Sequence, residues 1–145
     1  MYTILICDDD RDIVSALDIY LTSEGYQTVK AYNGREALKA VEQREIHLIL
    51  MDIMMPELDG IRATAKLREE NNVPIILLTA KSEDTDKILG LNIGADDYIT
   101  KPFNPLEVIA RVKSQLRRYT SLGGSEKSTG LITVGPVSMD DSAKR

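Results

Sequence analysis

Three short runs of apolar residues, at positions 4–6, 48–51 and 75–78, lack the alternation of apolar and polar side chains that marks a half-exposed strand. Continuous runs of this kind are typical of parallel strands that helices cover on both faces. Residues 27–32 give a weaker signal for a further strand, and residues 98–100 give a signal for a short one. The pattern therefore predicts five strands within the first 119 residues.

Between these strands, apolar residues recur at the three- and four-residue spacing of amphipathic helices. The first such stripe is followed by Gly25, which we expect to end its helix in the left-handed conformation. The apolar positions of the first four predicted helices are Ile13, Leu17, Tyr20 and Leu21, then Ala37, Leu38 and Val41, then Ile61 and Ala65, then Ile88 and Leu91.

The last predicted helix has a well-defined start. Asn104 is its expected N-cap, Pro105 takes the first helical position, and Glu107 would close a capping box. Its predicted apolar face consists of Leu106, Ile109, Ala110 and Leu116. Five strand–helix units with right-handed crossovers predict an α/β fold, a doubly wound five-stranded parallel sheet with five helices.

Composition and charge limit the possible functions. The 145 residues include 23 acids and 18 bases, a net charge of -5, which argues against nucleic-acid binding by this chain alone. No apolar stretch approaches the ~18 residues of a membrane helix, and the first residues lack a signal-peptide pattern, so we expect a cytoplasmic protein without membrane contact. Cys7, the only cysteine, lies in an apolar run and is interpreted as a core residue, with a reactive thiol as the less favoured alternative.

The composition changes near residue 120, which suggests a domain boundary. Residues 1–119 form the predicted domain, and the serine- and glycine-rich residues 120–130 are typical of a flexible linker. Residues 131–145 begin with a short hairpin pattern, and a hairpin alone is only marginally stable. We therefore expect residues 131–145 to be the start of a second domain that this chain does not contain.

Polar side chains follow the predicted strands, at the edge of an open α/β sheet where ligands bind. They are Asp8, Asp9, Asp10, Asp52, Thr79 and Lys101. Carboxylates brought together repel one another, and Mg²⁺, which prefers oxygen ligands, would relieve that repulsion. Asp10 is expected to cap the next helix instead. Thr79 and Lys101 supply a hydroxyl and an ammonium that can stabilise a phosphoryl group on a carboxylate.

In this order, the motifs resemble those of the receiver domain of two-component response regulators, which has a flavodoxin-like (CheY-like) fold. More narrowly, they resemble the winged-helix (OmpR/PhoB-like) transcription-factor subfamily. The resemblance covers residues 2–119. The motifs are Asp8-Asp9, Asp52, Met55-Pro56 to Asp59-Gly60, Thr79-Ala80, Gly94-Ala95-Asp96-Asp97-Tyr98 and Lys101-Pro102-Phe103.

The resemblance implies a phosphorylation site and a metal site. Asp52 would accept a phosphoryl group from a sensor histidine kinase, in a reaction that needs Mg²⁺. The ion would be held by Asp9, Asp52 and the Met54 carbonyl, with Asp8 acting through water. The protein would catalyse only its own phosphoryl transfer and the hydrolysis of its aspartyl phosphate, and would not otherwise be an enzyme. The single histidine, His47, opens a predicted strand and is expected to be structural, so the phosphoryl donor is external.

The same resemblance implies a conformational switch. Thr79 and Lys101 would contact the phosphoryl oxygens, and Tyr98 would turn inward as Thr79 moves. The alternative for Tyr98 is an ordinary half-buried aromatic side chain at the sheet edge. A cis peptide bond is predicted between Lys101 and Pro102, which would place the Lys101 ammonium over the acidic cluster.

Phosphorylation is expected to produce a homodimer through the fourth helix, fifth strand and fifth helix. The expected pairs across the two-fold axis are Lys87 with Glu107, Asp97 with Arg111, and Asp96 with Lys113. DNA would be bound only through an output domain, because the recognition helix of a winged-helix domain is absent from this sequence. On this view the chain is either an expressed fragment or a truncated natural product.

Two other functions are compatible with parts of the pattern. Asp8 could be the nucleophile of a haloacid dehalogenase-like phosphatase, whose Asp-x-Asp motif also follows a buried strand. Against this, Lys101 follows the acidic pair Asp96-Asp97 instead of preceding it, and no threonine stands four residues after Asp8. A receiver without an output domain is the third possibility, and the hairpin pattern after residue 130 argues against it.

Overall fold

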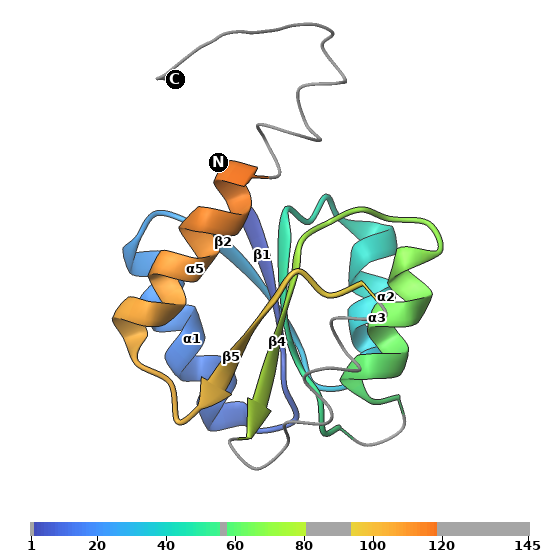
Figure 1. The fold of residues 1–145 in the computed structure, drawn as a ribbon, viewed down its shortest axis with the longest axis horizontal. Coiled ribbons are helices and arrows are strands. Elements are labelled where there is room, and N and C mark those ends of the chain that lie inside the picture. The colour runs from blue at the N-terminus through green and yellow to red at the C-terminus, as the bar shows by residue number, and fades with distance from the viewer. Residues whose placement is uncertain (1, 56–57, 81–93, 119–145) are drawn as a thin grey trace, which may run out of the picture.

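A computed structural model describes residues 2–55, 58–80 and 94–118 of the chain. Its centre is a five-stranded sheet in the order β2-β1-β3-β4-β5, in which every neighbouring pair is parallel (Figure 1). The strands are β1 (Thr3–Cys7), β2 (Gln27–Ala31), β3 (Leu48–Asp52), β4 (Ile75–Ala80) and β5 (Asp97–Lys101).

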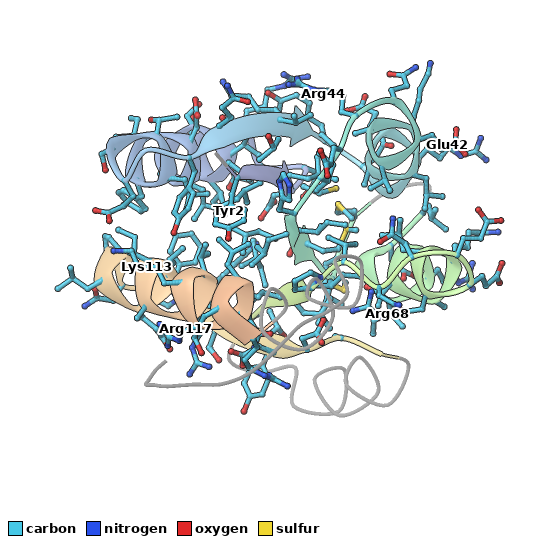
Figure 2. The ribbon with its side chains drawn as sticks, turned by 90° about the horizontal axis from the view of Figure 1, so that it is seen from above. Tyr2, Glu42, Arg44, Arg68, Lys113 and Arg117 are labelled. Atoms are coloured by element: carbon cyan, nitrogen blue, oxygen red, sulfur yellow. The ribbon has the colours of Figure 1, made fainter. Side chains whose placement is uncertain are left out.

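Four described helices cover the two faces of the sheet. They are α1 (Arg11–Ser23), α2 (Gly34–Gln43), α3 (Gly60–Arg68) and α5 (Pro105–Arg118). Helices α1 and α5 lie on one face, and α2 and α3 lie on the other (Figures 1 and 2). The doubly wound parallel fold is therefore confirmed. The helix predicted around Ile88 and Leu91 lies outside the described residues, as do the predicted linker at 120–130 and hairpin at 131–145.

The core is divided into two layers because successive strand residues point to opposite faces. In β1, Ile4 and Ile6 pack with α1 and α5, whereas Leu5 and Cys7 pack with α2 and α3. All residues of β1 and β3 are buried, which explains their uninterrupted apolar runs. The edge strands β2 and β5 are only partly buried, which explains their weaker sequence signals.

The predicted end of the first helix is confirmed. Gly25 has a φ of +91°, a backbone conformation that side chains with a Cβ rarely adopt. Its N–H donates to the Thr22 carbonyl (3.0 Å), and the Tyr26 N–H donates to the Leu21 carbonyl (3.2 Å). These two bonds form a Schellman motif, which satisfies carbonyls at the end of α1 and turns the chain into β2.

The predicted apolar face of α5 is wrong at Leu106 and Ala110, which are both exposed, whereas Leu116 is buried as predicted. Leu106 is 77% exposed, and the buried apolar side chains are Val108, Val112 and Leu116. These three recur every four residues, whereas Leu106 lies two residues before Val108 and so points roughly to the opposite side of the helix. The Asn104 side chain caps the helix by accepting from the Leu106 N–H (2.7 Å).

The predicted capping box does not form. The Glu107 carboxylate bonds Arg111 Nε (3.1 Å) instead of returning to the backbone N–H of Asn104. Among the described residues, no helix combines the length and the apolar character that a membrane span requires.

Candidate functional site

Three carboxylates meet at the edge of the sheet where β1 and β3 end. Asp8 follows β1 and is fully buried, Asp52 ends β3 and is 4% exposed, and Asp9 is exposed. One carboxylate oxygen from each lies within 4.8 Å of the others. In the observed strand order, β2 lies on one side of β1, and β3 and the later strands lie on the other. Open α/β sheets bind ligands at this switch in strand order, at the carboxyl ends of the strands. The structure thus brings together the three aspartates expected at one metal site.

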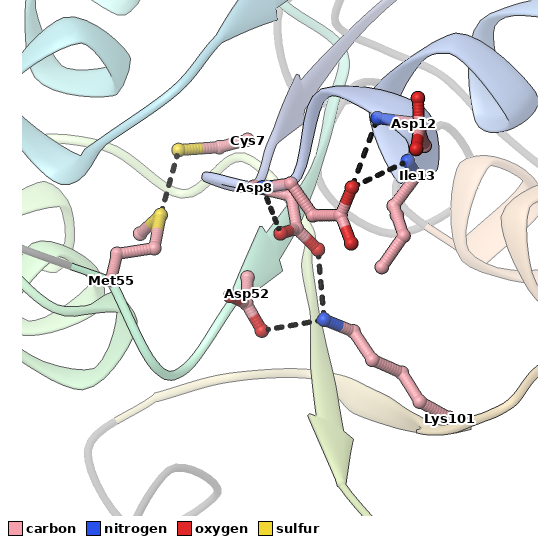
Figure 3. A network of polar contacts seen from close by, with 8 residues as sticks. Cys7, Asp8, Asp12, Ile13, Asp52, Met55 and Lys101 are labelled. Carbon is pink, nitrogen blue, oxygen red and sulfur yellow. Dashed lines mark hydrogen bonds and ion pairs between the residues drawn. The ribbon is translucent and has the colours of Figure 1, made fainter.

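The Lys101 ammonium reaches into this cluster from the end of β5 (Figure 3). Its Nζ lies 2.9 Å from Asp8 Oδ2 and 3.0 Å from Asp52 Oδ1. The peptide bond between Lys101 and Pro102 is cis, as predicted. Burial would lower the pKa of Lys101, but the two carboxylates outweigh it and raise that pKa. Lys101 is therefore charged at neutral pH and partly neutralises the cluster.

Burial makes the carboxylates harder to ionise. Burial, followed by repulsion from Asp8, raises the pKa of Asp52 to about 7 even though Lys101 offsets part of the rise. The pKa of Asp8 is also raised by burial, although the Asp10 N–H and Lys101 stabilise its charged form. When the three carboxylates are ionised, one ammonium leaves two negative charges uncompensated. All donor atoms are carboxylate oxygens, so the cluster fits a hard divalent cation.

Asp10 takes the structural role that the sequence predicts. Its carboxylate accepts from the Asp12 N–H (3.0 Å) and the Ile13 N–H (3.4 Å) and so caps α1. Its own N–H donates to Asp8 Oδ1 (2.9 Å). The start of α1 therefore holds the Asp8 side chain in place.

The structure also describes Thr79, Tyr98 and Met54, the other residues predicted for the phosphorylation site and its switch. Thr79 is fully buried near the end of β4, next to β5, and its hydroxyl donates to the Ala80 carbonyl (3.2 Å). Tyr98 is half-buried in β5 and packs against the apolar layer under α2 and α3. Met54 is 60% exposed just after β3. The switch roles of Thr79 and Tyr98 and the ligand role of the Met54 carbonyl stay predictions.

The charges predicted for a dimer interface have partners within the chain. Arg111 Nη1 donates to both carboxylate oxygens of Asp97, at 2.8 Å each. Lys113 lies on the side of α5 near α1 (Figure 2), with its Nζ 2.9 Å from Glu24 Oε1. Arg111, Asp97 and Lys113 are therefore already paired within one chain. The intermolecular pairs themselves stay a prediction, and Lys87 lies outside the described residues.

Arg68 was not recognised from the sequence, where it looks like any arginine on a helix surface. At the end of α3, its Nε donates to the Gly94 carbonyl (2.8 Å) and its Nη1 to the Val73 carbonyl (2.6 Å). Its Nη2 lies 2.6 Å from Asp96 Oδ2, which also accepts from the Ile75 N–H (2.8 Å). Arg68 thus joins the end of α3 to the starts of β4 and β5, and it is the partner that Asp96 uses in this structure.

Glycine at position 60 is required by the site itself. A Cβ on Gly60 would lie 2.0 Å from the carbonyl oxygen of Asp52. This close approach lets the Gly60 N–H donate to the Ile53 carbonyl (2.9 Å) and closes the segment that follows Asp52. The motif that ends in Asp59-Gly60 was the sequence signal for this packing.

His47 and Cys7 are structural, as predicted. His47 Nδ1 accepts from the Thr3 N–H (3.0 Å), so the histidine helps to align β3 with β1. Cys7 is fully buried, and burial raises the pKa of its thiol, which disfavours the reactive thiolate.

Comparison with known proteins places this site in a family. Residues 4–113 match the response regulator receiver domain family. The regulatory protein VanR of Enterococcus faecium is 47% identical over 131 residues, which are 90% of this chain and 57% of VanR. The alkaline phosphatase synthesis transcriptional regulatory protein PhoP of Bacillus subtilis is 51% identical over 140 residues, which are 92% of this chain and 58% of PhoP. The chain thus spans a little over half the length of these curated relatives.

The fold comparison agrees. A CheY-like response regulator receiver domain protein from Methanospirillum hungatei superposes with a TM-score of 0.80 at 31% identity, covering 85% of this chain and 99% of that one. None of these relatives supports the phosphatase alternative. The matched segment includes the aspartate cluster, Thr79 and Lys101. The chain belongs to the response regulator receiver domain family of two-component signalling proteins.

Proposed function

We propose that Asp52 accepts a phosphoryl group from a histidine kinase in a reaction that depends on Mg²⁺. The observation that carries the proposal is the position of the Asp52 carboxylate, beside Asp8 and Asp9 and 3.0 Å from the Lys101 ammonium. In this arrangement one acceptor carboxylate is accompanied by further oxygen ligands for a metal and by a cation for the incoming phosphoryl group.

The proposed chemistry forms one bond and breaks one. An oxygen of the Asp52 carboxylate attacks the phosphorus of the kinase phosphohistidine, the P–N bond breaks, and its electrons return to the imidazole. Mg²⁺ would be held by Asp9, Asp52 and the Met54 carbonyl, with Asp8 acting through water. When bound, the ion would stabilise the ionised carboxylate and offset charge on the phosphoryl oxygens. The Lys101 ammonium, which now donates to the Asp52 carboxylate, would then donate to a phosphoryl oxygen.

The proposed consequence of phosphorylation is a change in assembly. Movement of Thr79 toward the phosphoryl group would allow Tyr98 to turn inward and alter the face of β5 and α5. The changed face would favour a homodimer. VanR and PhoP are named as regulatory proteins, PhoP as transcriptional. We accordingly propose that the full-length protein controls transcription through a DNA-binding output domain.

Incubation of the chain with Mg²⁺ and acetyl phosphate tests the acceptor. We expect the intact mass, measured in acid, to increase by one phosphoryl group, and peptide mapping to place it on Asp52. Asp52→Asn should abolish labelling and Asp8→Asn should weaken it, whereas Asp18→Asn, a change in an acidic residue on α1, should leave it intact. Full labelling of Asp52→Asn would refute the proposal.

A further inference from the structure

We propose that Gly34, the first residue of α2 after the turn that follows β2, positions the segment after β3 for metal binding. The inference rests on the proposed function, because that segment carries the Met54 carbonyl expected to bind Mg²⁺. Gly34 would not touch the metal. It would act through Leu58 and, with its neighbour Asn33, through Cys7 and Met55.

The base of the segment is fixed by the sheet and by α3. The Ile53 N–H donates to the Leu78 carbonyl of β4 (3.1 Å), and the Ile53 carbonyl accepts from the Gly60 N–H (2.9 Å). These bonds fix the two ends of the segment. They leave open what sets the positions of Met54, Met55 and Leu58, which are among the described residues between those ends.

Gly34 provides the first contact from outside the segment. Its N–H donates to the Leu58 carbonyl (3.1 Å). A Cβ on Gly34 would lie 2.3 Å from the Leu58 carbonyl oxygen and 3.0 Å from the Leu58 Cβ. Backbone rarely approaches a Cβ this closely, so Leu58 can occupy this position only because residue 34 has no side chain.

Cys7 provides a second contact between the same turn and the segment (Figure 3). Its Sγ lies 3.2 Å from the Asn33 carbonyl oxygen and 3.5 Å from Met55 Sδ. A thiol has one proton, so it can donate to one of these partners at a time, while packing holds the other. Because Cys7 is fully buried, the contact has little room to shift.

Met54 therefore lies between anchored residues. Met55 and Leu58 are held by the turn, and Ile53 is held by the sheet. The Met54 side chain is 60% exposed, so its own packing contributes little to where its backbone lies. The direction of its carbonyl is then set by the contacts of its neighbours, which is the arrangement that tunes metal ligands from outside the coordination sphere.

Gly34→Ala in the 145-residue chain tests the inference. Its added methyl group would displace Leu58, and we expect the affinity for Mg²⁺, measured by shifts of backbone amide NMR resonances during titration with MgCl₂, to fall by about tenfold or more. Gly25→Ala is the control, because it strains the backbone at a φ of +91° and a Cβ there would meet nothing within 4 Å. It should reduce stability and leave Mg²⁺ affinity unchanged. Equal affinities of Gly34→Ala and wild type, or an equal loss in Gly25→Ala, would overturn the inference.

A second pair of variants decides the question if Gly34→Ala does not fold. Met55→Ala removes the thiol contact, and Val41→Ala removes a comparable half-buried side chain from the same apolar layer. We expect weaker Mg²⁺ binding in Met55→Ala only, and equal effects of the two would refute positioning by the turn. A wild-type chain that fails to bind Mg²⁺ refutes the metal site itself, whereas wild-type binding with unaltered variants refutes the role of Gly34 alone.

Discussion

Replacing Asp52 by asparagine removes a carboxyl group whose pKa the fold raises from 3.8 to about 7. The rise comes first from burial and then from repulsion by Asp8, and Lys101 reverses only part of it. One pKa unit corresponds to about 1.4 kcal/mol, so the ionised carboxylate destabilises the metal-free folded state by about 4 kcal/mol. Asparagine has nearly the same shape and no charge. We therefore expect Asp52→Asn to be more stable than wild type at about pH 8 without metal, by up to about 4 kcal/mol.

The gap should depend on pH with a definite sign. The pKa of Asp52 is higher in the folded than in the unfolded chain, so between 3.8 and about 7 the unfolded chain binds fewer protons. The free energy of unfolding of wild type therefore falls as pH rises through this window. Asp8, whose pKa burial also raises, is present in both proteins, so the difference between them chiefly reports Asp52. The gap should grow from near zero below about pH 4 to its full value near pH 8.

Urea denaturation followed by circular dichroism, in EDTA and at several pH values, measures the gap. Addition of Mg²⁺ should narrow it, because wild type gains about 2.7 kcal/mol at a metal concentration 100 times its Kd, and Asp52→Asn lacks one proposed ligand. Equal stability of the two proteins near pH 8 would refute the reasoning. An equally large difference in the free energy of unfolding at low pH would also refute the reasoning, because the Asp52 carboxyl is protonated there and carries no charge to remove.

Three further substitutions test other contacts. Lys101→Met leaves two buried carboxylates without their cation and should lower the metal-free free energy of unfolding at neutral pH by about 3 kcal/mol, a loss that Mg²⁺ should partly restore in the same urea titration. Arg68→Ala should lower the free energy of unfolding by about 2 to 4 kcal/mol. Arg68→Lys should restore little of this loss, because one ammonium cannot reproduce three directed N–H bonds. If thermal unfolding showed full stability in Arg68→Lys, this reasoning would be wrong. Arg111→Glu should weaken the dimer that beryllofluoride induces, and adding Asp97→Arg should partly restore it; an unaltered dimer in analytical ultracentrifugation would remove Arg111 from the interface.

The sheet could be predicted from sequence because its central strands are covered on both faces. In β1 and β3 every residue is buried, so the apolar runs are unbroken and the polar residue that ends each run stands out. Asp8 and Asp52 were identified in this way. Parallel strands in adjacent positions end at one edge of the sheet, so their proximity follows from topology alone.

Contacts between side chains of distant segments could not be predicted in this way. Arg68 contacts Gly94, just before β5, and Gly34 contacts Leu58. In both pairs the two residues lie far apart in the sequence. The sequence misplaces the apolar face of α5 because Leu106 and Ala110 are apolar but exposed. Periodicity over so few residues does not decide which side of a helix faces the core. These details depend on how helices dock against the finished sheet.

The internal partner of Arg111 changes what its charge can contribute to a dimer. In one chain Arg111 already bonds both oxygens of Asp97 and the carboxylate of Glu107, and its side chain is 39% exposed. A pair with Asp97 of a second chain would exchange one partly exposed ion pair for another, and such pairs are worth about 0 to 1 kcal/mol each. The exchange happens twice in a symmetric dimer and still leaves a small net gain, so the charges can set the alignment of the two chains while burial of apolar surface supplies the affinity. Arg111→Glu also breaks the internal ion pair with Asp97. Its effect on the monomer is therefore measured separately by unfolding. The change in dimerisation that this monomer effect does not explain is the part that belongs to the interface.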